Sequence, residues 1–134
     1  MITIKVYDSL MQDTSDFYSI MGRYFASLDI KKELESQLYN KVGSIWYLIY
    51  NDYELVGFCA LYPTKDNYMY LDNLYVFPQY RGNGYATELI SNIIKCHNKI
   101  HLIACNDYAI KIYKSLGFIE FGNNGKWKKF KNFL

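Results

Sequence analysis

A strand-like run near the middle of the chain passes through a glycine-containing turn directly into an amphipathic helix. The turn contains Gly82 and Gly84, and Arg81 precedes the first glycine. Backbone N–H groups at a helix start have no intrahelical acceptor, so several of them can converge on an anion. Glycine allows a ligand to approach the backbone closely, and arginine adds a positive charge. The pattern indicates an anion-binding turn or, alternatively, only a tight connection between a strand and a helix.

Two common phosphate-binding motifs do not fit this turn. The spacing is not G-x-G-x-x-G, which excludes a dinucleotide-binding fingerprint, and no Gly-Lys-Ser/Thr follows, which excludes a P-loop.

The turn resembles the acetyl-CoA signature of the GNAT superfamily of N-acetyltransferases, Gln/Arg-x-x-Gly-x-Gly/Ala after a Leu-x-Val strand. It matches in two registers, residues 79–84 and residues 81–86. A second family signature is an Asn followed by a helix of the pattern Ala-x-x-x-Tyr-x-x-x-Gly-Phe. The matching residues are Asn106, Ala109, Tyr113, Gly117 and Phe118. The order of the expected elements also matches, so the resemblance covers essentially the whole chain.

The resemblance implies acetyl-CoA as cosubstrate. The residues that would hold its pyrophosphate are Arg81, Gly82, Asn83, Gly84, Tyr85, Ala86 and Thr87. The residues that would bind pantetheine through their backbone are Leu74, Tyr75 and Val76, and an N–H near Val76 would stabilise the oxyanion. The pantetheine arm would fill the gap between this strand and a splayed parallel neighbour, like an added strand. Asn106 would also contact pantetheine, although Asn is a favourable helix N-cap as well.

Tyr113 matches the family tyrosine that protonates the departing coenzyme A thiolate. A thiol with a pKa of about 8.5 leaves readily, so a general acid there contributes on the order of 10² to 10⁴-fold. Spacing alone is also compatible with a packing role, in which Tyr113 is one of the chain's 15 tyrosines and belongs to the apolar stripe of a helix.

Two residues are candidates for the general base that an attacking ammonium requires. Asp72 lies four residues before Val76, where polyamine acetyltransferases of the family carry a glutamate in a similar context. His101 lies five residues before Asn106, where ribosomal-protein N-terminal acetyltransferases carry a catalytic glutamate. Asp72 can instead be a hydrogen-bonded residue of a strand or bulge, and His101 a core histidine. We favour Asp72.

The elements that position these residues follow from hydrophobic periodicity. Strands are expected at 2–7, 44–50, 54–62, 68–77 and 100–104, and a hairpin from 118–121 and 126–133 across residues 122–125. Helices are expected after Asp8, with Leu10 in the apolar stripe, and over 30–39, 84–98 and 106–116. The predicted fold is an α/β (α+β) GNAT-like domain spanning residues 1–134. Its mixed, mostly antiparallel sheet has about seven strands, a splayed parallel pair for the cofactor, and four flanking helices.

Charge and cysteine usage restrict the function further. A net charge of +2 does not indicate nucleic-acid binding, and the lysine-rich run 126–131 alternates like a solubilising edge strand. The three cysteines lack CxxC spacing and are expected to be buried and reduced. With His97 and His101 they show no zinc-site spacing, so no metal is predicted. No signal-peptide pattern or membrane-length apolar run occurs, and a soluble cytoplasmic protein is expected.

The predicted function is transfer of an acetyl group from acetyl-CoA to a primary amine of a small molecule or peptide, by direct attack in a ternary complex. The alternatives are a non-catalytic acyl-CoA-binding module and a small interaction domain with an accidental glycine turn. The sequence does not identify the acceptor amine, and both a monomer and a homodimer are compatible with it.

Overall fold

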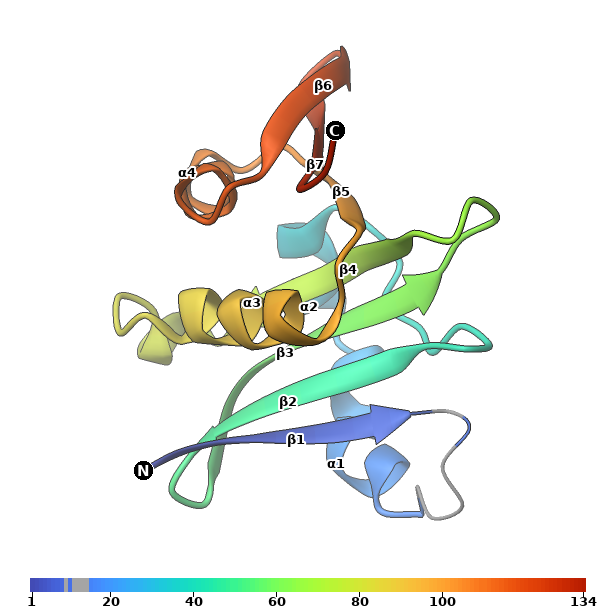
Figure 1. The fold of residues 1–134 in the computed structure, drawn as a ribbon. Helices are drawn as coiled ribbons and strands as arrows, with labels where there is room; N and C mark the ends of the chain where they lie inside the picture. The colour runs from blue at the N-terminus through green and yellow to red at the C-terminus, as the bar shows by residue number, and fades with distance from the viewer. Residues whose placement is uncertain (9, 11–14) are drawn as a thin grey trace.

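The computed structural model describes residues 1–8, 10 and 15–134. One seven-stranded sheet runs through the molecule in the order β1-β2-β3-β4-β5-β7-β6 (Figure 1). The strands are β1 (Ile2–Asp8), β2 (Ile45–Asn51), β3 (Glu54–Pro63), β4 (Met69–Val76), β5 (Ile100–Ala104), β6 (Ile119–Asn124) and β7 (Trp127–Lys131). The helices are α1 (Phe17–Phe25), α2 (Leu28–Leu34), α3 (Tyr85–Cys96) and α4 (Asp107–Ser115), with a 3-10 turn at Pro78–Tyr80. The mixed sheet with four helices confirms the predicted fold.

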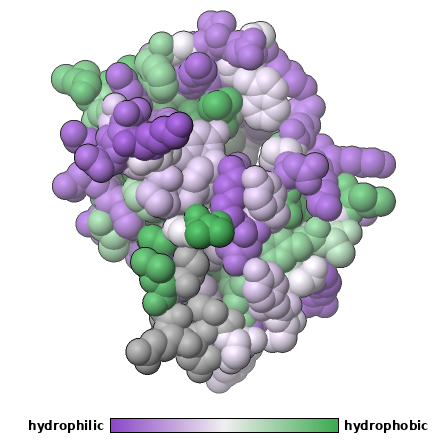
Figure 2. Space-filling view, turned by 90° about the vertical axis from the view of Figure 1, so that its right-hand side faces the viewer, coloured by the Kyte–Doolittle hydropathy of each residue, from purple (hydrophilic) through white to green (hydrophobic). Residues whose placement is uncertain are grey.

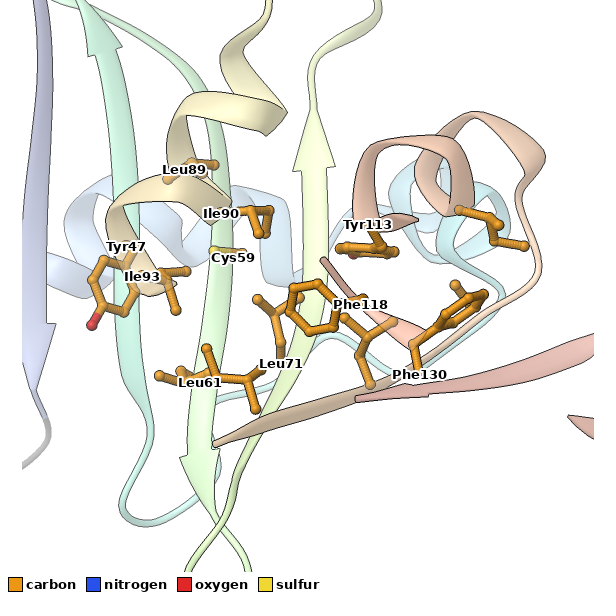
Figure 3. Packing of buried hydrophobic residues seen from close by; sticks show 14 of the residues in the cluster. Tyr47, Cys59, Leu61, Leu71, Leu89, Ile90, Ile93, Tyr113, Phe118 and Phe130 are labelled. Atoms are coloured by element: carbon orange, nitrogen blue, oxygen red, sulfur yellow. The ribbon is translucent and has the colours of Figure 1, made fainter. Parts of the chain in front are cut away.

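The two faces of the sheet carry separate hydrophobic cores. On one face α3 places Leu89, Ile90 and Ile93 against Leu61 and Leu71 of the sheet (Figure 3). The other core joins α1 and α2 to the sheet, and the residues that it buries include Phe17, Met21, Ile30, Trp46, Phe58 and Phe77. Because strand residues alternate between faces, β2, β3 and β4 supply both cores; β2 and β3 are largely buried, and β4 alternates buried and partly exposed residues.

The parallel pair in the middle of the sheet separates almost as soon as it forms. β4 pairs with β5 only through Met69↔Ile100 and Tyr70↔His101, whereas β5 continues along β7 as far as Ala104. The remainder of β4, residues 71–76, therefore has a strand neighbour on one side only. This divergence opens the sheet beside the turn that carries the two glycines.

A bulge interrupts β4 where it leaves β5. Phe58 pairs with Tyr75 and Ala60 pairs with Asp72, so Asn73 and Leu74 together oppose a single residue of β3. Asn73 has a positive φ of 56°, which is uncommon for a residue with a side chain. Its backbone N–H donates to the Asp72 carboxylate at 2.9 Å, which stabilises the kink.

The two N-terminal helices differ from the expectation. α1 begins at Phe17, and Leu10 is exposed outside it, so the predicted helix after Asp8 is wrong for Leu10; residues 9 and 11–14 lie outside the described part. α2 begins at Leu28 and ends at Leu34 rather than Tyr39, because Glu35 adopts a left-handed φ of 53°. The Glu35 carboxylate accepts hydrogen bonds from Cys105 and Lys126, which are distant in the chain. The helical pattern of apolar residues cannot predict such contacts.

The C-terminal hairpin is longer and tighter than expected. β6 extends to Asn124 and β7 begins at Trp127, so the turn lies at residues 125–126 rather than 122–125. The prediction of an edge strand at residues 126–131 is wrong, because β7 lies between β5 and β6 and buries Phe130. The outermost strand on this side is β6.

Two smaller expectations can be compared with the structure. All three cysteines are free, but only Cys59 is buried, since Cys96 is exposed and Cys105 partly exposed. No helix within the described residues has the length and apolarity needed to cross a membrane.

On the face that Figure 2 shows, hydrophobic residues are scattered among hydrophilic ones.

Candidate active site

A cavity of about 880 Å³ lies where β4 and β5 diverge. Its walls come from the end of α2, the inner edge of β4, the end of β5, the first turns of α3 and α4, and the C-terminal hairpin. It thus has one side toward α3 and α4 and another toward α2. The side chains of several elements far apart in the chain meet here because the sheet opens at this point.

The glycine turn forms one end of the cavity. Gly82 and Gly84 have φ values of 84° and 80°, and apart from the adjoining residues no described atom lies within 4 Å of the position that a Cβ would take at either glycine. Among the described residues, no backbone acceptor is found for the N–H groups of residues 82–87, which precede the first intrahelical bond of α3, from Glu88 to Gly84. The turn has the open, donor-rich geometry of an anion cradle.

The Arg81 side chain lies away from this cradle. Its Nε donates to the Val76 carbonyl oxygen at 2.8 Å and one terminal nitrogen donates to Glu33 of α2 at 2.7 Å. The guanidinium also lies over the Tyr75 ring, 5.3 Å from its centroid. Arg81 therefore connects the turn to α2, and its charge is directed toward Glu33.

Tyr113 projects from α4 among apolar groups and is 4% exposed (Figure 3). Its ring packs against Phe118 and Phe130, with centroid separations of 5.7 and 6.5 Å, and the residue lines the cavity. Burial raises the pKa of its hydroxyl well above the ordinary value, so Tyr113 stays protonated at neutral pH. The hydroxyl makes no hydrogen bond to another described residue, which leaves its proton available.

Asp72 lies on the α2 side of the cavity. Burial raises the pKa of its carboxyl group, and the hydrogen bond from the Asn73 backbone and the charge of Lys41 oppose that rise. Both readings of Asp72 thus apply, since it supports a bulge and also lines the cavity. Next to it, Asn73 is 6% exposed and its amide oxygen has no hydrogen-bond partner in the described structure.

His101 is not brought into the cavity. Its ring lies edge-on to the rings of Tyr68 and Tyr70, at centroid distances of 5.6 and 4.9 Å. Its Nε2 is buried without a partner among the described residues, and burial lowers its pKa. The surroundings are those of a partly buried aromatic cluster at the point where β4 and β5 still pair.

Asn106 caps α4 and also lines the cavity. Its side-chain oxygen accepts hydrogen bonds from the backbone N–H groups of Tyr108 and Ala109 at 2.8 and 3.3 Å. The amide NH₂ group has no partner within the described residues, so it is available to a ligand while the oxygen serves as the cap.

The cavity therefore gathers most, but not all, of the predicted site residues. Those that line it are Asp72, Leu74, Tyr75, Val76, Arg81, Gly82, Ala86, Asn106 and Tyr113. Those that do not line it are Asn83, Gly84, Tyr85, Thr87 and His101. Sequence reasoning missed several other lining residues, including Lys41, Tyr62, Tyr70, Tyr108, Trp127 and Lys129. No local motif marks these residues, and apart from Tyr70, which belongs to β4, tertiary folding brings them to this strand.

Charged and aromatic residues of the two N-terminal helices and the neighbouring sheet differ in their access to the cavity. Glu33 and Glu35 line the cavity, whereas the aromatic residues Tyr24, Phe25 and Trp46 belong to the core beneath α1 and α2. Among the described residues, no group of three or more His, Cys, Asp or Glu side chains could hold a metal ion.

Comparison with known proteins places the chain among acyl-group-transferring enzymes. Residues 7–118 match the model of the acetyltransferase (GNAT) family. A thialysine N-epsilon-acetyltransferase of Mus musculus is 30% identical over 70 residues, which cover 47% of this chain and 41% of that protein. The match thus spans about two fifths of the length of that relative.

Solved structures share the fold at low sequence identity. Escherichia coli ElaA superposes with a TM-score of 0.75 at 17% identity, covering 99% of this chain and 100% of the other. An acyl-CoA N-acyltransferase from Pseudomonas aeruginosa gives 0.77 at 10% identity, with the same coverage. The N-acetyltransferase PseH of Campylobacter jejuni, solved with acetyl coenzyme A, gives 0.64 at 16% identity, covering 96% of this chain and 97% of that one.

Proposed function

Because the chain belongs to the acetyltransferase (GNAT) family, we propose that it transfers the acetyl group of acetyl-CoA to a primary amine of a small molecule or peptide, by direct attack within a ternary complex. The observation that carries this proposal is the cavity that joins the open glycine turn to the partly buried carboxylate of Asp72. A cofactor entering along the turn and an amine entering beside α2 would meet between β4 and β5.

The residues of the turn fit a coenzyme A pyrophosphate. Apart from the adjoining residues, neither glycine has a described atom within 4 Å of its missing Cβ, and the N–H groups there have no backbone acceptor among the described residues. A cavity of 880 Å³ lies within the range of sites for large organic ligands. The unpaired inner edge of β4, at Leu74 to Val76, offers backbone groups to an extended pantetheine arm.

Bound acetyl-CoA supplies an acetyl group activated as a thioester. Asp72, on the α2 side, is proposed to accept a proton from the attacking ammonium. Its raised pKa makes it a better match to an amine than an ordinary aspartate. Tyr113, on the α4 side, is proposed to donate its hydroxyl proton to the departing sulfur. His101 remains the alternative base, but it would need a path from outside the cavity.

Binding and turnover can be tested separately on the purified protein. Calorimetry with acetyl-CoA measures binding, and a free-thiol assay over a panel of primary amines measures coenzyme A release. We expect binding and amine-dependent release above hydrolysis. Binding without amine-dependent release would favour a non-catalytic acyl-CoA-binding module, and an absence of binding would contradict the proposed cofactor site.

A further inference from the structure

Lys41 occupies an unusual position in the wall of the cavity. It lies in the connection between α2 and β2, is partly buried, and lines the α2 side. Its ammonium donates to the Tyr62 hydroxyl at 2.8 Å and lies 4.1 Å from the centroid of the same ring. These contacts hold a lysine, ordinarily a mobile surface residue, at one place in the cavity.

Among the described residues, the Lys41 ammonium forms no ion pair, although the Asp72 carboxylate acts on it electrostatically. The charged residues that line it are Glu33, Glu35, Lys41, Asp72, Arg81 and Lys129. Glu33 pairs with Arg81 at 2.7 Å and Glu35 pairs with Lys126 at 2.6 Å, so both glutamates are neutralised. In the part of the chain that the structure describes, Lys41 forms no ion pair, and Lys129 is exposed on β7.

Lys41 and Tyr62 together present hydrogen-bond donors. The hydroxyl of Tyr62 accepts from Lys41 and keeps its own proton, because burial raises its pKa. The ammonium has two N–H groups beyond the one directed to Tyr62. An ammonium beside a tyrosine hydroxyl in a partly buried wall suits a carboxylate, since hydrogen bonds between opposite charges are about twice as strong as neutral ones.

The same side of the cavity carries Asp72 a short distance away. Tyr62 pairs directly with Tyr70 across β3 and β4, and Asp72 lies two residues further along the same face of β4. Two strand residues span about 7 Å. Lys41 and Asp72 also influence each other's pKa electrostatically. Lys41 and Asp72 are thus near enough to interact electrostatically, and an acceptor in the cavity meets both a cationic and an anionic group.

We propose, resting on the acetyl transfer proposed above, that Lys41 and Tyr62 bind a carboxylate of the acceptor, so that the preferred acceptors are amino acids or other amines bearing a carboxylate. The amine of such an acceptor lies toward Asp72 while its carboxylate lies at Lys41. A polyamine lacks the carboxylate, and one of its ammonium groups would meet the charge of Lys41.

The test compares acceptors that differ only in the carboxylate. L-lysine is paired with cadaverine and L-ornithine with putrescine, and kcat/KM is measured by coenzyme A release at saturating acetyl-CoA. We expect each amino acid to exceed its diamine by about 10-fold or more, as for one charge-assisted contact. Equal values, or a preference for the diamines, would overturn the inference while leaving acetyl transfer intact. If no amine of the panel is acetylated, the proposed function fails and this inference fails with it.

Variants locate the source of the preference. Lys41→Met keeps most of the length of the side chain and removes its charge, and we expect it to reduce the ratio of kcat/KM for lysine to that for cadaverine to about one, chiefly by raising KM for lysine. Lys41→Arg should retain a preference, and Tyr62→Phe should give an intermediate ratio. Lys65→Met removes an exposed lysine of the β3–β4 connection outside the cavity and should leave the ratio unchanged. If Lys41→Met and the unmodified protein have the same ratio of kcat/KM for lysine to that for cadaverine, a group other than Lys41 binds the acceptor carboxylate.

Discussion

Arg81 of the glycine turn and Glu33 of α2 form an ion pair of 2.7 Å, and both residues line the cavity. Glu33 also accepts a hydrogen bond from Tyr75 at 2.8 Å, so one carboxylate fixes groups of the turn and of β4. The Arg81 pair lowers the pKa of Glu33, which keeps it ionised. The conformation of the glycine turn is thereby coupled to α2.

This pair predicts the effect of Glu33→Gln. The substitution removes the charge that holds the Arg81 guanidinium, and Arg81 becomes free to turn toward an anion at Gly82. We expect acetyl-CoA to bind about 2- to 5-fold more tightly at low salt, with stability reduced by about 0.2–1 kcal/mol, as for an exposed ion pair. Calorimetry and urea unfolding measure the two effects. Glu120→Gln, on the outer strand β6, serves as the control for charge alone, and weaker binding in Glu33→Gln would contradict the mechanism.

Gly82→Asp should abolish acetyl-CoA binding. It places a Cβ and a negative charge where phosphate oxygens would approach backbone N–H groups. Since Gly82 has a φ of 84°, the substitution also costs about 1–2 kcal/mol of stability. Gly125→Asp is the matched control, because Gly125 also has a positive φ and open space but does not line the cavity. A thermal shift by acetyl-CoA that persists in folded Gly82→Asp would mean that the cofactor site is elsewhere.

Tyr113→Phe should separate catalysis from binding. The change removes a hydroxyl that has no hydrogen-bond partner among the described residues. We therefore expect little change in the free energy of unfolding and a dissociation constant for acetyl-CoA within a few-fold of that of the unmodified protein. Turnover should fall by roughly 10² or more, as for the loss of a general acid. Tyr108→Phe alters another tyrosine of α4 that lines the cavity and should remain near normal. Unchanged turnover of Tyr113→Phe under chemistry-limited conditions would exclude Tyr113 as the acid.

The pH profile of kcat/KM should identify the base. Burial raises the pKa of Asp72 from 3.8 and lowers that of His101 from 6.5, so the position of the acidic limb alone does not separate them. If Asp72 is the base, Asp72→Asn lowers kcat/KM and removes the acidic limb, while His101→Gln is nearly silent. The reverse pattern would assign His101. Unaltered rates in the double variant would mean that water deprotonates the amine and that the enzyme acts mainly by positioning.

Asp72→Asn should also stabilise the protein at neutral pH. A carboxyl group whose pKa is raised by folding contributes stability below its unfolded pKa, and that stability is lost as pH rises through the folded value. The amide carries no charge and can still accept the hydrogen bond from Asn73. The variant should therefore unfold at a higher temperature than the parent at pH 7, with the difference disappearing below about pH 3, the acid side of the ordinary aspartate range. Lower stability at pH 7 would show that the carboxylate itself supports the bulge.

The sequence by itself was sufficient to predict the helices, strands and turns that depend on neighbouring residues. The apolar stripe of α3, the aromatic and β-branched composition of β2 to β4 and the two family signatures depend on residues within a few positions of one another, and the structure has these elements where they were expected. The glycine turn could be predicted in the same way, because glycine adopts a positive φ without steric cost and both Gly82 and Gly84 have one.

Tertiary structure decided which side chains meet. The early end of α2 depends on Glu35, which is held by Lys126 and Cys105, residues 91 and 70 positions away. Lys41 reaches the cavity because β3 presents Tyr62 to it, and His101 lies outside because β4 and β5 still pair at that residue. The lysine-rich run became an inner strand because β6 pairs with β7 on its outer side. Contacts between residues so far apart depend on packing and strand order, and neither leaves a periodic signal in the local sequence.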